Sequence, residues 1–314
     1  MENATQIVLN LFPVLALFVL GYVLRRTHFF EHSAVSALKK LVVNIALPAL
    51  LFRAFASLNL EPRLLLVVIT VFSICVAMVL IGRVISWITG IKSPYFAILM
   101  GGFETGMVGY AIFIAAYGAE NVPALALVDL GQVTFVFFVL MSLLISLRGE
   151  RYTVAQLTRR LISSPVIIAI AAGMVFGLVT AHVSVRETAL FQAASSLITL
   201  VGGLTVPLIC IVIGYELEID RSSLGLPLFT IAVRTVLLVG FAAAVNALLI
   251  RQLLDLPSIY ERAVLTMFIL PPPFVIPLFM DQTDRENMRY VTNTLSMGTL
   301  ASAGVFIAVS FVMV

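Results

Sequence analysis

Four polar side chains, three of them ionisable, stand inside long apolar stretches of the chain. Glu104 lies about ten residues into the stretch near 95–118, and Arg234 about nine into the stretch near 225–250. Asp129 and Gln132 are spaced i, i+3 in the stretch 121–147, which places both on one helix face. An ionisable group at bilayer depth is costly and is a functional candidate by default.

Each of these groups has more than one interpretation. Glu104 is expected to exchange a proton, or it only stabilises the local backbone. Arg234 pairs with Glu104 or Asp129, binds an anion through its paired donors, or has a structural role as an ion pair or a snorkelling side chain. Asp129 and Gln132 bind a cation together with free carbonyl oxygens, or they fasten helices by polar packing. The sequence leaves these alternatives open.

The composition predicts an α-helical integral membrane protein. Of 314 residues, 61% are hydrophobic and 11% are charged, and the mean hydropathy is +1.12. A membrane helix needs about 20 mostly apolar residues, and such stretches recur about ten times. They lie near 5–24, 33–58, 64–88, 95–118, 121–147, 161–181, 187–215, 225–250, 258–280 and 286–314.

Basic residues predict the orientation. Lys and Arg concentrate in the odd-numbered connections, which places these in the cytoplasm and both termini on the non-cytoplasmic side of a cell membrane. The first stretch lacks a basic start and a small-residue cleavage site, so it is expected to remain as a helix. The net charge of +3 reflects this topology and gives no indication of a nucleic-acid partner.

Metal, cofactor and catalytic chemistry are not expected. Cys75 and Cys210 stand singly inside apolar stretches, and His28, His32 and His182 fall in predicted loops. No nucleophile and base, and no set of metal ligands, are grouped in the sequence, so we expect no cofactor and no enzyme.

An internal repeat predicts two halves of five helices. "NIALPALLF" (Asn44 to Phe52) matches "GLTVPLICI" (Gly203 to Ile211), and "GYAIFIAAYG" (Gly109 to Gly118) lies opposite "PFVIPLFMDQ" (Pro273 to Gln282). The second offset places Asp129 on Asn293 and Gln132 on Ser296. An odd number of helices per half makes the repeat inverted, which is a transporter architecture with discontinuous helices at the binding site.

The interruptions are expected in helices 4 and 9. The stretch "MGGFETGMVGY" contains four glycines, and Pro271, Pro272 and Pro273 are consecutive in the partner stretch. Proline removes a backbone donor and clashes with the preceding turn. The alternative is that these residues only serve packing or kinking, because Gly and Pro are common in membrane helices.

These motifs, in this order over ten short-looped helices, resemble the auxin efflux carrier family, which includes the plant PIN carriers and many bacterial transporters. The chain resembles a bacterial member related to the PIN carriers. The resemblance implies an elevator-type fold with broken, crossing helices 4 and 9. It assigns 1–60 and 151–221 to a scaffold domain, and 61–150 and 222–314 to a transport domain. It also implies a homodimer formed through the scaffold and a small organic anion as substrate.

The resemblance implies a substrate site at the two breaks, where N–H groups at the start of each second half-helix attract a carboxylate. Two departures affect specificity: Glu104 stands where many members have Asn, and apolar residues follow the prolines where Asn is common. The candidate substrate-binding residues are Asn44, Glu104, Thr105, Gly106, Gly109, Tyr110, Arg234, Pro271, Pro272, Pro273 and Phe274.

The sequence therefore predicts a secondary transporter for a small organic anion, with malate, malonate or an auxin-like carboxylate as examples, working by alternating access and proton-coupled. The alternative is a sodium-coupled symporter or a cation/proton antiporter. The candidate residues for ion or proton coupling are Glu104, Asp129, Gln132, Asn293 and Ser296.

Overall fold

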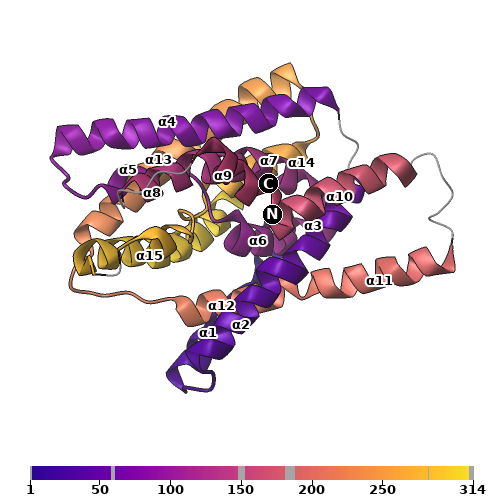
Figure 1. Cartoon of the computed structure of the whole chain (residues 1–314), viewed down its shortest axis with the longest axis horizontal. Helices are drawn as coiled ribbons and strands as arrows, with labels where there is room; N and C mark the ends of the chain where they lie inside the picture. Colours follow the sequence, from indigo (N-terminus) through magenta and orange to yellow (C-terminus); the bar gives the residue numbers. More distant parts are fainter. Residues whose placement is uncertain (1, 58–60, 148–152, 181–187, 282, 311–314) are drawn as a thin grey trace. The chain divides into compact units, whose positions relative to one another are not determined.

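The structure is a computed structural model that describes residues 2–57, 61–147, 153–180, 188–281 and 283–310. Every regular element in these ranges is helical, so the predicted all-α fold is confirmed for this part of the chain (Figure 1). Three predicted loop arginines, Arg148, Arg151 and Arg186, and His182 lie outside the described residues. The chain divides into two compact units, and each is described by itself.

Unit 1 comprises residues 1–61, 106–126 and 160–217. Helix 2 of the sequence prediction contains a π-helical turn η1, and Pro48 is tolerated because it lies in the first turn of α3. The elements of unit 1 are α1 (Glu2–Arg26), α2 (His32–Leu41), η1 (Val42–Ala46), α3 (Leu47–Ala56), α6 (Tyr110–Tyr117), η4 (Ala119–Asn121), α10 (Pro165–Thr180), α11 (Ala189–Gly203) and α12 (Thr205–Glu216).

Two pairs of helices in unit 1 pack at close range through glycine. Helix α1 lies along α12 (Figure 1), where a Cβ on Gly21 would collide with the backbone of Ile211 and one on Gly214 with the backbone of Phe18. Helix α3 packs on α10 in the same way, at Gly173. Small residues permit this close approach in membrane helices, whose association depends on van der Waals contact.

Unit 2 comprises residues 62–105, 127–159 and 218–314. The long helices α4 and α13 pack against two short helices: α4 contacts α5, and α13 contacts both α5 and α14. Most residues of α5 and α14 are buried. The elements are η2 (Pro62–Leu64), α4 (Leu65–Thr89), α5 (Tyr95–Met100), α7 (Val122–Phe135), η5 (Val136–Leu140), α8 (Met141–Leu147), α9 (Val154–Ile162), α13 (Gly225–Ala244), η7 (Val245–Leu253), α14 (Ser258–Phe268), η8 (Ile276–Phe279) and α15 (Arg285–Ser310). Three elements are divided between the units. These are the π-helical turn η3 (Thr105–Gly109), α7, whose residues 122–126 belong to unit 1, and α9, whose residues 160–162 belong to unit 1.

The number of membrane spans differs from the ten predicted. The described residues contain seven helices long and apolar enough to cross a membrane, or eight if the pair bent by 66° between α9 and α10 counts as one span. The predicted ninth span is shorter than expected because α14 ends at Phe268 and covers only about 16 Å. The count of ten and the inverted repeat are therefore not confirmed.

Candidate functional site

The predicted fourth helix is interrupted at Gly101 to Glu104, between the end of α5 and the start of η3. We call this segment the helix-4 break; it does not belong to the element α4. Gly102 has a φ of +71°, where L side chains are strained, and a Cβ on it would lie 2.9 Å from the Pro273 ring. Gly101 is enclosed as well, by Phe135 and Val79. The first pair of glycines thus makes the break, while Gly106 and Gly109 lie in η3.

The helix-9 break begins after Phe268 and contains the three prolines, which adopt no helical structure. Beyond them, Phe274 and Val275 form a turn that leads into the four-residue 3₁₀ helix η8. The second half-helix expected here is absent from the described chain, because the prolines and Pro277 supply no N–H donors for it. An anion site at this position therefore depends on individual backbone donors of the break, and it remains a prediction.

The two breaks meet inside unit 2. The Glu104 N–H donates to the Pro271 carbonyl at 2.9 Å, and the Phe274 N–H donates to Glu104 Oε2 at 2.6 Å. Next to these bonds, the rings of Phe103 and Phe268 stack with their centroids 5.2 Å apart. One residue of helix 4, Glu104, therefore binds the helix-9 break through both its backbone and its carboxylate.

Arg234 lies in α13, 3% exposed, and its guanidinium binds the carbonyl ends of both interrupted helices. Nη1 donates to the Leu99 oxygen at 3.1 Å and to the Met100 oxygen. Nη2 donates to the Gly102 oxygen at 2.5 Å and to the Leu270 oxygen at 3.3 Å. The guanidinium also lies 5.1 Å from the centroid of the Phe103 ring, within the range of a cation–π contact.

Polar groups of α7 lie against the helix-4 break. Gln132 is buried, and its Nε2 donates to the Phe103 carbonyl. The Gln132 Oε1 and the Thr105 hydroxyl are buried with no hydrogen-bond partner within the described protein. Asp129 is 5% exposed on the same helix, one turn earlier. Unsatisfied buried polar atoms are uncommon and cost free energy, which marks the region beside Glu104 as a place where a polar ligand or water gains hydrogen bonds.

Asn293 and Ser296, the counterparts predicted for Asp129 and Gln132, bind the linker between α12 and α13. Asn293 Nδ2 donates to the carbonyls of Asp220 and Ser223 at 2.8 and 3.0 Å, and its Oδ1 accepts from the Asp220 N–H at 2.8 Å. Ser296 Oγ accepts from the Glu218 N–H at 3.2 Å. These bonds anchor the linker on α15, and a part for either residue in coupling remains a prediction.

The linker also carries an exposed ionic contact. Hydrogen bonds from the Ser222 side chain and backbone hold the pKa of Asp220 below its usual value, and Arg289, 3.8 Å away, adds to this. The Asp220 side chain is 49% exposed, so the ion pair contributes little to stability. A hollow of about 450 Å³ adjoins it, lined by Glu218, Ile219, Asp220, Arg285, Met288, Arg289, Thr292 and Asn293.

The remaining predicted site residues belong to unit 1. Tyr110 is fully buried at the start of α6, directly after Gly106 and Gly109. Asn44 is exposed in η1, and its Nδ2 donates to the Lys40 carbonyl at 2.9 Å. A contact of these residues with a substrate remains a prediction.

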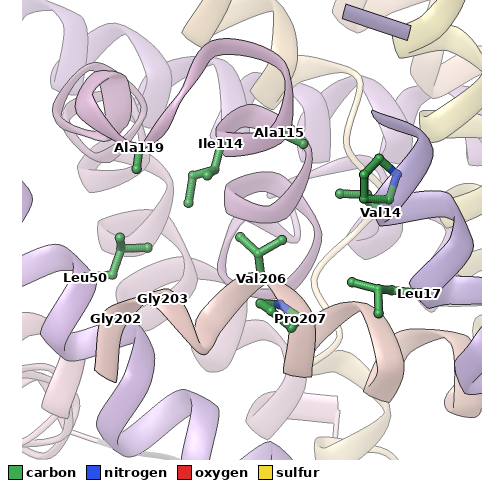
Figure 2. Close-up of a pocket in the computed structure, with 11 residues that line it drawn as sticks. Val14, Leu17, Leu50, Ile114, Ala115, Ala119, Gly202, Gly203, Val206 and Pro207 are labelled. Atoms are coloured by element: carbon green, nitrogen blue, oxygen red, sulfur yellow. The ribbon is translucent and has the colours of Figure 1, made fainter. Parts of the chain in front are cut away.

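Unit 1 also holds an apolar cavity of about 400 Å³ (Figure 2). Residues of the short helix α6 and the turn after it face residues of α1, α3, α11 and α12 across it. Pro207, which the repeat pairs with Pro48, is part of the wall. The full lining is Pro13, Val14, Leu17, Leu50, Ile114, Ala115, Ala119, Gly202, Gly203, Val206 and Pro207.

Sequence reasoning missed three components of the break region. These are the Pro271 carbonyl that binds Glu104, the stacked pair of Phe103 and Phe268, and the carbonyl ends that bind Arg234. The phenylalanines were detectable, since each lies beside a break. The carbonyl partners were not, because any residue type supplies a carbonyl.

Comparison with known proteins decides the general class. Residues 6–305 match the family model described as "Membrane transport protein". The chain belongs to this family. A search of curated proteins finds no relative of the transporter. Among its described residues, no group of three His, Cys, Asp or Glu side chains is placed to hold a metal ion.

Proposed function

We propose that the transporter carries a small organic anion, whose carboxylate binds the helix-9 break in exchange for the carboxylate of Glu104. The observation that supports this most is the 2.6 Å bond from the Phe274 N–H to Glu104 Oε2. The break binds a carboxylate already, namely one from its own chain. Hydrogen bonds to charged acceptors are the stronger kind, so a substrate carboxylate gains the same bond when Glu104 gives it up.

Proton coupling follows from this exchange. An ionised Glu104 competes with the substrate for the Phe274 N–H and repels its negative charge. A protonated Glu104 is a weaker acceptor and carries no charge, so it releases the site to the anion. One proton on Glu104 therefore accompanies one bound carboxylate, and the transporter moves both.

The surroundings favour an organic anion over an inorganic one. The partly exposed Phe274 and Val275 and the buried Ile276 present apolar surface next to the Phe274 N–H. An inorganic anion gains nothing from such surface, whereas the carbon body of a small organic acid buries area against it. The positive guanidinium of Arg234, which binds carbonyls of both breaks, adds a favourable field for an anion.

Elevator-type alternating access is the proposed mechanism, with unit 2 as the transport domain and unit 1 as the scaffold through which two copies pair in a cell membrane. The division into two compact units supports this assignment, except that residues 106–126, which the resemblance places in the transport domain, fall in unit 1. Within unit 1, α1 of the predicted first helix packs on α12 of the predicted seventh, and α3 of the predicted second helix packs on α10 of the predicted sixth. These pairs exchange under an inverted 5+5 repeat, which supports the proposed architecture.

Uptake of radiolabelled small carboxylates into proteoliposomes, measured against pH, tests the proposal. We expect wild-type uptake to rise as the pH falls, because protonation of Glu104 frees the Phe274 N–H. Glu104→Gln should transport at a rate independent of pH. The control Glu120→Gln removes an exposed carboxyl group and should keep the wild-type profile. A wild-type pH profile in Glu104→Gln would remove Glu104 from this role.

A further inference from the structure

Arg234 uses its hydrogen-bonding capacity on the backbone ends of two interrupted helices. The two terminal nitrogens of a guanidinium carry four N–H bonds. Four carbonyl oxygens accept from these nitrogens: those of Leu99, Met100, Gly102 and Leu270. Three belong to the end of α5 and its break, and the fourth, Leu270, lies in the break that follows α14, so a single cation binds both breaks.

The position is one that otherwise suits a hard cation. The C-terminal end of a helix carries partial negative charge and unsatisfied carbonyl oxygens, and two such ends converge on Arg234. Hard cations bind carbonyl oxygens of this kind, and in transporters unwound carbonyls and half-helix ends coordinate a coupling ion. In this chain a side chain occupies that position permanently.

Snorkelling does not explain Arg234, because the residue is 3% exposed and its guanidinium points to carbonyls at the breaks. A second cation at the same oxygens would be repelled strongly at this range in a buried site. We propose that Arg234 is a tethered cation that takes the place of a soluble coupling cation at the breaks, so that the transporter binds and moves its substrate without Na⁺. This inference rests on the proposed use of the breaks as the substrate site.

Thermal unfolding of the purified wild-type protein in NaCl and in choline chloride is the first test. An ion that binds only the folded state stabilises it by RT ln(1 + c/Kd) at a free ion concentration c, so Tm rises once the ion concentration exceeds Kd. We therefore expect the same Tm in both salts at equal ionic strength. A higher Tm in NaCl would overturn the proposal. No organic acid is present, so this result is independent of whether a carboxylate binds.

Variants of Arg234 supply the second test. Arg234→Ala leaves four carbonyl oxygens without their donor, and its Tm should fall by about 5 °C or more. Millimolar guanidinium, far below denaturing concentrations, should restore part of this loss, and NaCl should now stabilise the variant over choline chloride. Arg83→Ala, which removes an exposed arginine of α4, should show neither effect.

Other results would count against the tethered cation. An unchanged Tm in Arg234→Ala, or equal stabilisation of Arg234→Ala and Arg83→Ala by guanidinium, would contradict it. Arg234→Lys keeps the charge but has three donors for four oxygens, so we expect a partial loss of Tm with no response to Na⁺. A Na⁺ response in Arg234→Lys would contradict the proposal even if Arg234→Ala does not fold.

Discussion

The helix-4 break and the helix-9 break interrupt their helices by different means. In helix 4 the chain leaves α5 through two glycines and returns to a helix after four residues. In helix 9 three prolines prevent any return beyond one 3₁₀ turn. The repeat predicts equivalent halves, but glycine keeps its N–H and a free φ, whereas proline has no N–H and a fixed φ.

This difference divides the chemistry between the two breaks. Helix 4 contributes the charged side chain, Glu104, and helix 9 contributes the backbone groups that bind it, the Pro271 carbonyl and the Phe274 N–H. Phe274 is the first residue after the prolines with a donor. The proposed anion site therefore depends on the two breaks together, and neither repeat alone predicts it.

The largest effect on this comparison should come from filling the helix-4 break. Gly102→Ala places a residue with a Cβ at a φ of +71° and 2.9 Å from the Pro273 ring. We expect a loss of roughly 3 kcal/mol, from the left-handed backbone and the crowding together. Gly90→Ala is the matched control, since Gly90 has a φ of +69° with nothing within 4 Å, and it should lose only about 1 kcal/mol. Thermal unfolding of both variants measures the loss of stability. Equal losses would show that the Pro273 ring moves aside without a cost in free energy.

A smaller effect is expected when a methyl group is added to α15 at the position that faces the helix-9 break. Gly298 lies in α15, and a Cβ on it would be 3.3 Å from the Pro271 Cβ. Gly298→Ala gains about 0.5–1 kcal/mol of helix stability, and crowding against Pro271 offsets it, so the net change should be near zero. The control Gly304→Ala meets nothing within 4 Å in the same helix and should keep the full gain. Equal unfolding temperatures for the two variants would mean that Pro271 shifts to accommodate the added methyl group without a loss of stability.

Much of the fold could be predicted from the sequence, because long apolar stretches define membrane helices and clustered Gly and Pro define interruptions. The location of each break within its stretch could be predicted only coarsely. Four glycines mark helix 4, and only the tertiary contacts of Gly101 and Gly102 with Phe135 and Pro273 decide which pair breaks it. The length of helix 9 depends on Pro277 as well, which the sequence analysis did not weigh.

The sequence predicted which residues belong to the candidate site, but it did not predict which groups they bind. Glu104, Arg234 and Gln132 stand out as polar groups in apolar surroundings, and all three bind the backbone of a break. The sequence offered a side-chain partner for Arg234, because a charge suggests an opposite charge. It binds carbonyl groups instead, which carry no sequence signal. Asn293 and Ser296 contact the linker in the same way, since backbone N–H groups donate to, and backbone carbonyl oxygens accept from, any suitable amide or hydroxyl.

The central claim is that Glu104 and the substrate carboxylate compete for the Phe274 N–H. The affinity of one carboxylate, found by a thermal-shift screen and measured by calorimetry at neutral pH, tests this directly in the wild type and in Glu104→Gln. Replacing a charged competitor by a neutral one should strengthen binding roughly tenfold, and the two proteins should converge at acidic pH. Equal or weaker binding by Glu104→Gln at neutral pH would contradict the account.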